Sequence, residues 1–394
     1  MQNRQLTARE AVRQLNVSRI REVANAGMGR SDLLAFWFGE PDQVTPGFIR
    51  HAATDALDAG ETFYTENLGI MPLREAIAHY VSGIHGKTRG ETGVENIAVT
   101  NSGMSALMIT NQALVGPGDR VVTVTPVWPN LVEIPKILGA DSIAFPLTFS
   151  AHGWHLDLER LLAALTPDTV AFYVNSPNNP TGWTIDNESQ RAILEHCRRH
   201  GIWILADDAY ERIYFENEQG IAPSFLDIAD PDDRLVSTNT FSKAWQMTGW
   251  RLGWMVMPKA LSSNVATLIE YNTSCAPGFV QRAGVSALEL GEPTVRDFNA
   301  RLKSARDFLL ERLMALPGVE ASVPSGAMYA FFRIAGAEDS LAFCKRLIDS
   351  AGLGLAPGVA FGPEGEGFVR WCFAASQTRL EDGIARLDKA LRQK

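Results

Sequence analysis

The sequence of 394 residues has few cysteines, no long hydrophobic run and no excess of positive charge. Its four cysteines, Cys197, Cys275, Cys344 and Cys372, lie far apart without a C-x-x-C pair, which argues against a disulfide scaffold or a zinc site and fits a reducing compartment. No 18-residue apolar stretch occurs, and the first thirty residues contain no apolar signal region. These absences predict a cytoplasmic protein with no metal site and no membrane span.

The charge balance is acidic. The 36 Lys and Arg against 45 Asp and Glu give a net charge of −9, which would repel a phosphate backbone, so we expect no nucleic-acid partner.

Neither G-x-G-x-x-G nor a P-loop pattern marks a dinucleotide or ATP site. With 46% apolar residues, the chain can bury a large core, and its length predicts two or three domains.

Short β-rich runs alternate with helix-length segments from about residue 50 to residue 257. Runs that are apolar on both faces and separated by more than a dozen residues are typical of a mostly parallel sheet covered by helices. We therefore expect a doubly wound α/β domain, placed at residues 46–290. The runs are residues 97–100, 121–124, 142–145, 169–174, 202–206, 235–238 and 252–257.

The pattern changes after residue 290. Apolar residues from Val295 to Leu316 repeat at steps of three and four, which predicts one long amphipathic helix between Pro293 and Pro317. Strands at 329–334 and 368–374, with helices at 340–350 and 378–392, then predict a smaller α+β unit. We expect the first 45 residues to pack with it, giving a small domain of residues 1–45 and 291–394.

One lysine stands at the end of a predicted strand. Lys243 lies in the segment TFSKAWQMTGWRLGW, residues 240–254, with small and aromatic neighbours and with Arg251 eight residues later. Removal from water in such a loop would lower the pKa of the lysine and make it a nucleophile. A solvated loop lysine is the commoner alternative when this lysine is taken alone.

Other strand ends carry polar groups that suit a small ligand. Asp207 and Tyr210 follow the strand at 202–206, Asn179 lies in the turn NSPNNPTGW, and the small-residue turn NSGMSAL at 101–107 begins a helix. Each also has a purely structural alternative, such as helix capping or a connecting loop. In open α/β sheets, however, ligands bind beyond the carboxyl ends of the strands, and a free helix start can hold a phosphate. With Lys243, this set suits a phosphorylated aldehyde held as a Schiff base, and pyridoxal phosphate (PLP) fits.

With these motifs the chain resembles the class I and II PLP-dependent aminotransferases of fold type I, in particular those similar to aspartate aminotransferase. The resemblance implies a large domain with a mostly parallel seven-stranded sheet and a smaller α+β domain from both termini. It also implies ping-pong transfer of an amino group from an α-amino acid to a 2-oxo acid by a homodimer. The matching segments cover nearly the whole chain: FGEPDQVTP, YTENLGIMPLR, NNPTG, DDAY, SKAWQMTGWRLG and LAPGVAFG…FVRWCFA.

The resemblance also implies roles for individual residues. Lys243 would form the internal aldimine and shuttle the proton, Asp207 would partner the pyridine nitrogen, and Tyr210 would donate to the 3′ oxygen. Arg370 would bind the substrate α-carboxylate, and Trp37 is either a pocket residue or a core aromatic. The other implied contacts are Gly39 at the substrate, Asn179 at both the substrate and the 3′ oxygen, Trp128 stacked on the ring, Ser102, Gly103, Met104, Thr240, Ser242 and Arg251 at the phosphate, and Tyr64 at the phosphate in the neighbouring subunit.

The choice of substrate depends on less evidence. In some aspartate-using members a lysine in the phosphate turn helps with the distal carboxylate, and residues 102–105 contain none. We therefore expect a neutral or aromatic amino donor, with Trp37, Trp128, Met104, Tyr329 and Phe361 as pocket residues. The same apparatus would also serve a β-eliminating lyase or a decarboxylase, or a PLP-binding protein without turnover.

Overall fold

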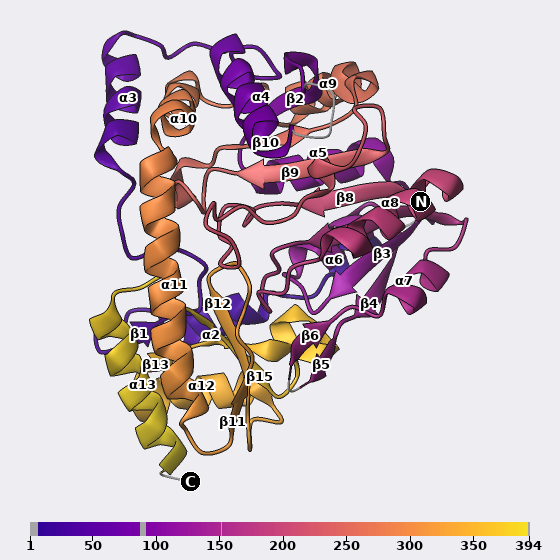
Figure 1. The fold of residues 1–394 in the computed structure, drawn as a ribbon. Helices are drawn as coiled ribbons and strands as arrows, with labels where there is room; N and C mark the ends of the chain where they lie inside the picture. The colour runs from indigo at the N-terminus through magenta and orange to yellow at the C-terminus, as the bar shows by residue number, and fades with distance from the viewer. Residues whose placement is uncertain (1–6, 87–91, 151, 393–394) are drawn as a thin grey trace.

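A seven-stranded sheet forms the centre of the larger part of the molecule in the computed structural model, which describes residues 7–86, 92–150 and 152–392 (Figure 1). The strand order is β2-β10-β9-β8-β7-β3-β4. The strands are β2 (Ile97–Thr100), β3 (Arg120–Thr125), β4 (Asp141–Pro146), β7 (Thr169–Asn175), β8 (Trp203–Asp207), β9 (Leu235–Thr240) and β10 (Gly253–Val256).

The prediction of a mostly parallel sheet is confirmed. All seven apolar runs lie in this sheet, and the pairs β3–β4, β3–β7, β7–β8 and β8–β9 are parallel. Only β10 departs from this direction, since it pairs antiparallel with both β2 and β9. The carboxyl ends of β2, β7, β8 and β9 therefore meet at one edge.

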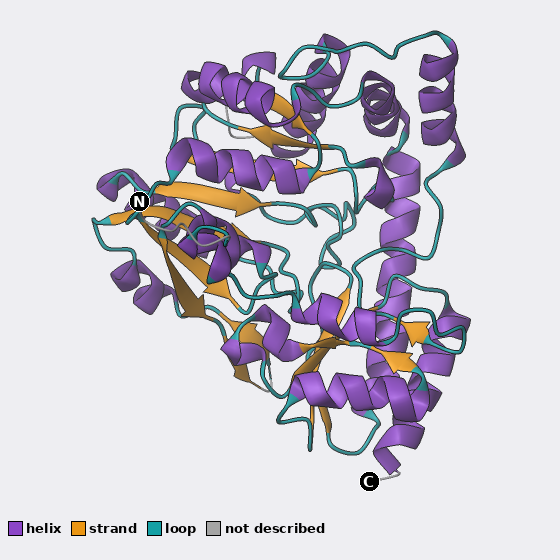
Figure 2. Cartoon of the chain, turned by 180° about the vertical axis from the view of Figure 1, so that it is seen from behind, coloured by secondary structure: helices purple, strands orange, loops and turns teal. Residues whose placement is uncertain are grey.

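Helices cover both faces of the sheet (Figures 1 and 2). Alternate strand residues divide between two apolar clusters, one with Leu73 and Ile193 from α4 and α8 and the other with Leu107 and Leu131 from α5 and α6. This double burial explains why the strands are apolar on both faces. The helices of this part are α3 (Gly47–Asp58), α4 (Met71–His85), α5 (Gly103–Leu114), α6 (Asn130–Ile137), α7 (Leu158–Ala164), α8 (Asn187–His200), α9 (Ser262–Thr273) and α10 (Gly278–Leu290).

A second, antiparallel sheet lies below the first in Figure 1. Its order is β11-β12-β15-β14, and it is accompanied by a small pair formed by β1 and β13. The elements of this part are α2 (Arg19–Ala26), β1 (Leu34–Ala35), β11 (Val319–Ala321), β12 (Tyr329–Ile334), α12 (Ser340–Ala351), β13 (Leu353–Gly354), β14 (Ala356–Pro357), β15 (Phe368–Cys372) and α13 (Gln377–Arg392). The hairpin of β5 (Thr148–Ser150) and β6 (Gly153–His155) packs against β15, whereas the short α1 (Glu10–Arg13) contacts α6 of the upper part.

The two ends of the chain come together in this lower part. The N-terminal β1 pairs with β13, and α2 packs against α12 and β14. The long helix α11 (Glu292–Met314) runs beside both parts of the molecule, as Figure 1 shows. The domain boundaries at residues 45 and 291 stay predictions, and residues 1–6 of the first range lie outside the described residues. Within the described ranges, no helix is long and apolar enough to cross a membrane.

Candidate active site

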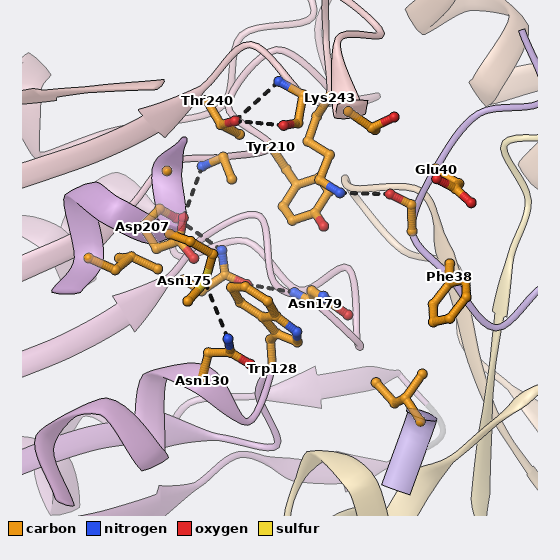
Figure 3. Close-up of a pocket in the computed structure, with 18 of the residues that line it drawn as sticks. Phe38, Glu40, Trp128, Asn130, Asn175, Asn179, Asp207, Tyr210, Thr240 and Lys243 are labelled. Atoms are coloured by element: carbon orange, nitrogen blue, oxygen red, sulfur yellow. Dashed lines mark hydrogen bonds between the residues drawn. The ribbon is translucent and has the colours of Figure 1, made fainter. Parts of the chain in front are cut away.

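A cavity of about 660 Å³ lies where the carboxyl ends of β2, β7, β8 and β9 face the lower sheet. Turns from the upper sheet, the segment before α3 and strands β12 and β15 form its walls, and Figure 3 shows these side chains converging. The structure thus brings thirteen of the predicted site and pocket residues together around one cavity: Gly39, Gly103, Met104, Trp128, Asn179, Asp207, Tyr210, Thr240, Ser242, Lys243, Arg251, Tyr329 and Arg370.

Lys243 is half-buried in this cavity. Its Nζ donates a hydrogen bond to the backbone carbonyl of Gly39 at 2.6 Å and lies 5.6 Å from the centre of the Tyr210 ring (Figure 3). Burial lowers the pKa of Lys243 to about 8, and the positive charge of Arg370 acts in the same direction. A much larger fraction of this amine is therefore neutral near pH 7 than for a solvated lysine, and only the neutral amine is a nucleophile or a base.

Asp207 ends β8 and is 6% exposed. Burial raises the pKa of its carboxyl group to about 6, and the Ala209 N–H, which donates to Oδ1 at 3.3 Å, opposes this rise. The neighbouring Asn175, which the sequence interpretation missed, donates from Nδ2 to the Asp207 carbonyl at 3.0 Å. Its Oδ1 accepts from the Asn179 N–H at 2.7 Å. Asn175 thus fixes two predicted site residues, and its position as the last residue of a buried strand was the available signal.

Two tyrosines meet opposite the lysine. The hydroxyl groups of Tyr210 and Tyr329 lie 2.7 Å apart, one following β8 and the other beginning β12. Burial raises the pKa of Tyr210 well above its usual value and that of Tyr329 to about 12. Both side chains therefore remain phenols that can donate hydrogen bonds at neutral pH.

The start of α5 forms one side of a cradle for an anion. Ser102 caps the helix by accepting from the Ser105 N–H at 3.4 Å, with a φ of 96° that favours glycine and must be held by its surroundings. A Cβ on Gly253 would lie 2.4 Å from the Gly103 nitrogen, so this position needs glycine. The free N–H groups of the first turn of α5 attract negative charge.

The turn after β9 forms the other side of the cradle. Thr240 Oγ1 accepts from the Ser242 N–H at 3.1 Å and donates to Ser242 Oγ at 2.9 Å. Arg251 donates from Nη1 to the Thr248 carbonyl at 2.7 Å, and its guanidinium lines the same cavity. Hydroxyl groups, helix N–H groups and an arginine around one space are a typical phosphate site.

Arg370 on β15 is 2% exposed and is held in place by protein groups. Its Nη1 donates to Asn179 Oδ1 at 2.8 Å, its Nη2 donates to the Trp37 carbonyl, and its guanidinium carbon lies 4.3 Å from the centre of the Tyr329 ring. Nε is buried and has no partner in the described part of the chain. A buried guanidinium with unused donor capacity is suited to bind a carboxylate.

Four predicted site or pocket residues lie outside the lining of the cavity: Ser102, Tyr64, Trp37 and Phe361. Phe361 is buried, with its ring centre 4.8 Å from the guanidinium carbon of Arg370. Ser102 acts as the helix cap, and Tyr64 is 89% exposed in the loop before α4. The Trp37 ring packs against the backbone of Gly354 and Gly27, so only the Trp37 carbonyl takes part, through Arg370. Lining residues that the sequence interpretation did not single out are Ser18, Ile20, Arg21, Phe38, Glu40, Leu107, Asn130, Asn175, Ala209 and Thr248.

Known proteins resemble this chain over almost its whole length. Residues 31–387 match the family model described as aminotransferase class I and II. An aspartate aminotransferase of Pyrococcus horikoshii is 33% identical over 385 residues, covering 97% of this chain and 96% of that protein. Aromatic-amino-acid aminotransferase 2 of Thermococcus litoralis is 30% identical over 390 residues, covering 96% of this chain and 97% of that protein.

The solved structures agree with the sequence matches. A double mutant of Thermus thermophilus aspartate aminotransferase is 30% identical, with a TM-score of 0.90 over 97% of this chain and 99% of that chain. The expected fold type is therefore confirmed. This chain belongs to the class I and II aminotransferases of fold type I, and it is an aminotransferase.

Proposed function

We propose that the cofactor of this aminotransferase is pyridoxal phosphate and that Lys243 binds it covalently. The observation that carries this proposal is a half-buried lysine, with a pKa lowered to about 8, in the same cavity as the buried carboxyl group of Asp207. The residues present fit the group. The cradle of α5 and the β9 turn suits its phosphate, Trp128 offers an aromatic face, and Asp207 offers a partner for a protonated ring nitrogen.

The side chains divide the work of the reaction. PLP, when bound, supplies an electron sink for the bonds to the substrate Cα. Lys243, once the substrate amine has displaced it from the cofactor, would take the proton from Cα as a neutral amine and would deliver it as the ammonium ion to the cofactor carbon C4′. Tyr210 donates a hydrogen bond toward the cofactor oxygen, and Arg370 with Asn179 binds the substrate α-carboxylate. The same residues serve both half-reactions, which is the basis of ping-pong kinetics.

We propose a neutral or aromatic amino donor. Met104 stands in the cradle turn, and Ile20, Phe38, Leu107 and Trp128 add apolar surface to the cavity wall. Such apolar surface stabilises an apolar side chain through burial, and Arg21, which also lines the cavity, lies over the Phe38 ring at 4.9 Å from its centre. Relatives of comparable similarity are named as aspartate and as aromatic-amino-acid aminotransferases, so relatedness alone does not choose between the two donor classes.

We also propose that the enzyme is a cytoplasmic homodimer in which Tyr64 reaches the neighbouring active site. Phe63, Tyr64 and Tyr271 are 84%, 89% and 87% exposed. Phe63 and Tyr64 lie in the loop before α4, and Tyr271 lies in the last turn of α9. Asn67 of that loop donates from Nδ2 to the carbonyl of Ser274, the residue after α9, at 2.7 Å and so joins the two segments. Exposed aromatic side chains on adjoining segments are typical of an interaction surface. The four free cysteines support a reducing compartment.

A spectroscopic titration tests the proposed function. Purified protein loaded with PLP should be yellow, and amino acids added without an oxo acid should bleach it to the pyridoxamine form. Neutral or aromatic amino acids should act at lower concentration than aspartate. A protein that takes up no PLP would contradict the assignment of Lys243, and release of ammonia without an added oxo acid would indicate a lyase instead.

A further inference from the structure

The turn from Asp207 to Arg212 has two faces. Asp207 and Tyr210 face the cavity, whereas Asp208, Glu211 and Arg212 point into the protein beneath it and are 4%, 3% and 2% exposed. Three charged side chains so close to the reaction centre, yet outside its lining, need partners because burial of unpaired charge is costly. Those partners show what holds the turn in place.

His85 is the main partner of this buried face. It is the last residue of α4, and its side chain is 2% exposed. Its Nδ1 lies 2.8 Å from Asp227 Oδ1, and its Nε2 lies 3.1 Å from Glu211 Oε2. Neutral imidazole has one N–H group, so only the doubly protonated imidazolium can donate to both carboxylates.

Other contacts surround the same junction. Tyr80, five residues before His85 on α4, donates to Glu211 Oε1 at 3.1 Å. Asp208 accepts from Ser237 of β9 at 2.6 Å and from Ser224 at 3.3 Å, and Arg212 donates to Glu292 of α11 at 2.9 Å. Asp227 belongs to the 3₁₀ turn η2 (Phe225–Asp227). The turn is therefore fixed from α4, β9, α11 and the segment at η2.

Glu211 directly follows Tyr210, so a clamp on Glu211 restricts the backbone that carries the phenol. The Tyr210 hydroxyl lies 2.7 Å from that of Tyr329, and its ring centre lies 5.6 Å from Lys243 Nζ. We propose that His85, as an imidazolium held between Asp227 and Glu211, is a positioning residue for transamination that fixes Tyr210 in the active site. This inference rests on the role proposed above for Tyr210.

The electrostatics agree with the geometry. Burial acts to lower the pKa of His85, but the hydrogen bonds from Asp227 and Glu211 outweigh it and raise that pKa to about 10. Glu211, Asp227, Asp208 and Tyr80 are the titratable groups that face the imidazole or its immediate partner. The ring therefore stays charged throughout the neutral range.

A double-mutant cycle tests the coupling. We expect His85→Asn to slow the single-turnover spectral change of the PLP-loaded enzyme with an amino acid by roughly tenfold and to change KM little, because a displaced catalytic group loses rate more than binding. In a Tyr210→Phe background, His85→Asn should add less than about twofold, since its target is already removed. His79→Asn, an exposed histidine on the same helix, is the matched control and should behave as the wild type.

Three outcomes of this cycle would contradict the proposed role of His85. Additive effects of His85→Asn and Tyr210→Phe would overturn the proposal, because they would mean that His85 does not act through Tyr210. The same holds if His85→Asn matches His79→Asn while Tyr210→Phe is slow. A wild-type rate for Tyr210→Phe would contradict the role of Tyr210 in the proposed function. It would also overturn the positioning role of His85, which acts through Tyr210.

Nuclear magnetic resonance on the cofactor-free wild-type protein gives an independent test that needs no variant to fold. With ring-labelled histidine, one of the seven histidines should keep the imidazolium signature up to about pH 9. Loss of the proton by all seven below about pH 8 would overturn the proposal, whatever the kinetics show.

Discussion

Arg370 Nη1 donates a hydrogen bond to Asn179 Oδ1, 2.8 Å away, and this bond crosses between the two sheets of the molecule. Arg370 lies on β15 of the antiparallel sheet, whereas Asn179 follows β7 of the seven-stranded sheet. The guanidinium also donates to the Trp37 carbonyl in the N-terminal segment. Three distant segments thus hold the arginine in one orientation before any substrate arrives, which reduces the entropy lost on binding.

Replacing this arginine should weaken substrate binding more than catalysis. We expect Arg370→Lys to raise KM for amino acids roughly 30-fold with a small effect on kcat, because losing one charge-assisted hydrogen bond to the α-carboxylate costs about 2 kcal/mol. Steady-state kinetics measure this directly. Arg333→Lys, whose side chain on β12 is 49% exposed, is the control, and an unchanged KM in Arg370→Lys would mean that the carboxylate binds elsewhere.

Lys243 should be indispensable for chemistry but not for folding. We expect Lys243→Ala to lose the visible absorbance of the lysine-bound cofactor and to lower transamination by about 10⁴-fold or more, because both the covalent link and the proton carrier are removed. Circular dichroism should show an intact fold. Lys259→Ala, whose side chain is 72% exposed, should keep full activity. Retained absorbance in Lys243→Ala would show that another lysine binds the cofactor.

We expect the ionised carboxylate of Asp207 to lower the stability of the folded protein and yet to be needed for activity. Burial raises its pKa to about 6 in the folded protein, against about 3.9 when unfolded, so its contribution to stability is full below pH 4 and is lost as the pH rises through 6. We therefore expect Asp207→Asn to stabilise the cofactor-free protein by roughly 3 kcal/mol at pH 8 and not at pH 4. The same variant should transaminate at least 100-fold more slowly. Urea unfolding at both pH values measures the first effect, and a stability difference that is the same at both would contradict it.

The fold could be predicted from the sequence because doubly buried strands are continuous apolar runs and α11 carries a regular apolar stripe. Those runs also predicted where the strands end, and so they located Asp207, Asn179 and Lys243. Asn175 and His85 were missed because the role of a buried polar residue depends on a partner distant in sequence, such as Glu211 for His85. The sequence also did not decide whether the Trp37 ring faces the cavity or the core. The neighbouring strand β1 has two residues, which is too short for an alternating pattern to define a buried face.

The substrate preference follows from the same cavity wall. We expect Met104→Lys to raise kcat/KM for aspartate relative to phenylalanine by about tenfold, since a cation there would offer the distal carboxylate a charged partner worth about 1.4 kcal/mol. Competition between the two amino acids under identical conditions gives the ratio. Met314→Lys on α11, which is 49% exposed and lies outside the cavity lining, is the matched control for added charge. A wild type that already prefers aspartate would contradict the neutral or aromatic assignment, whatever Met104→Lys does.

The charge of His85 should make stability fall at alkaline pH. Its pKa is about 10 in the folded protein and about 6.5 when unfolded, so its stabilising contribution is full below pH 6.5 and is lost as the pH rises through 10. Over pH 7 to 9, the advantage of the wild type over His85→Asn in the free energy of unfolding should shrink by about 1.4 kcal/mol per pH unit. Denaturant unfolding of the cofactor-free proteins measures this slope, with His79→Asn as the control. A difference that stays constant over that range would show that the imidazole is neutral and would contradict the positioning role proposed for its charged form.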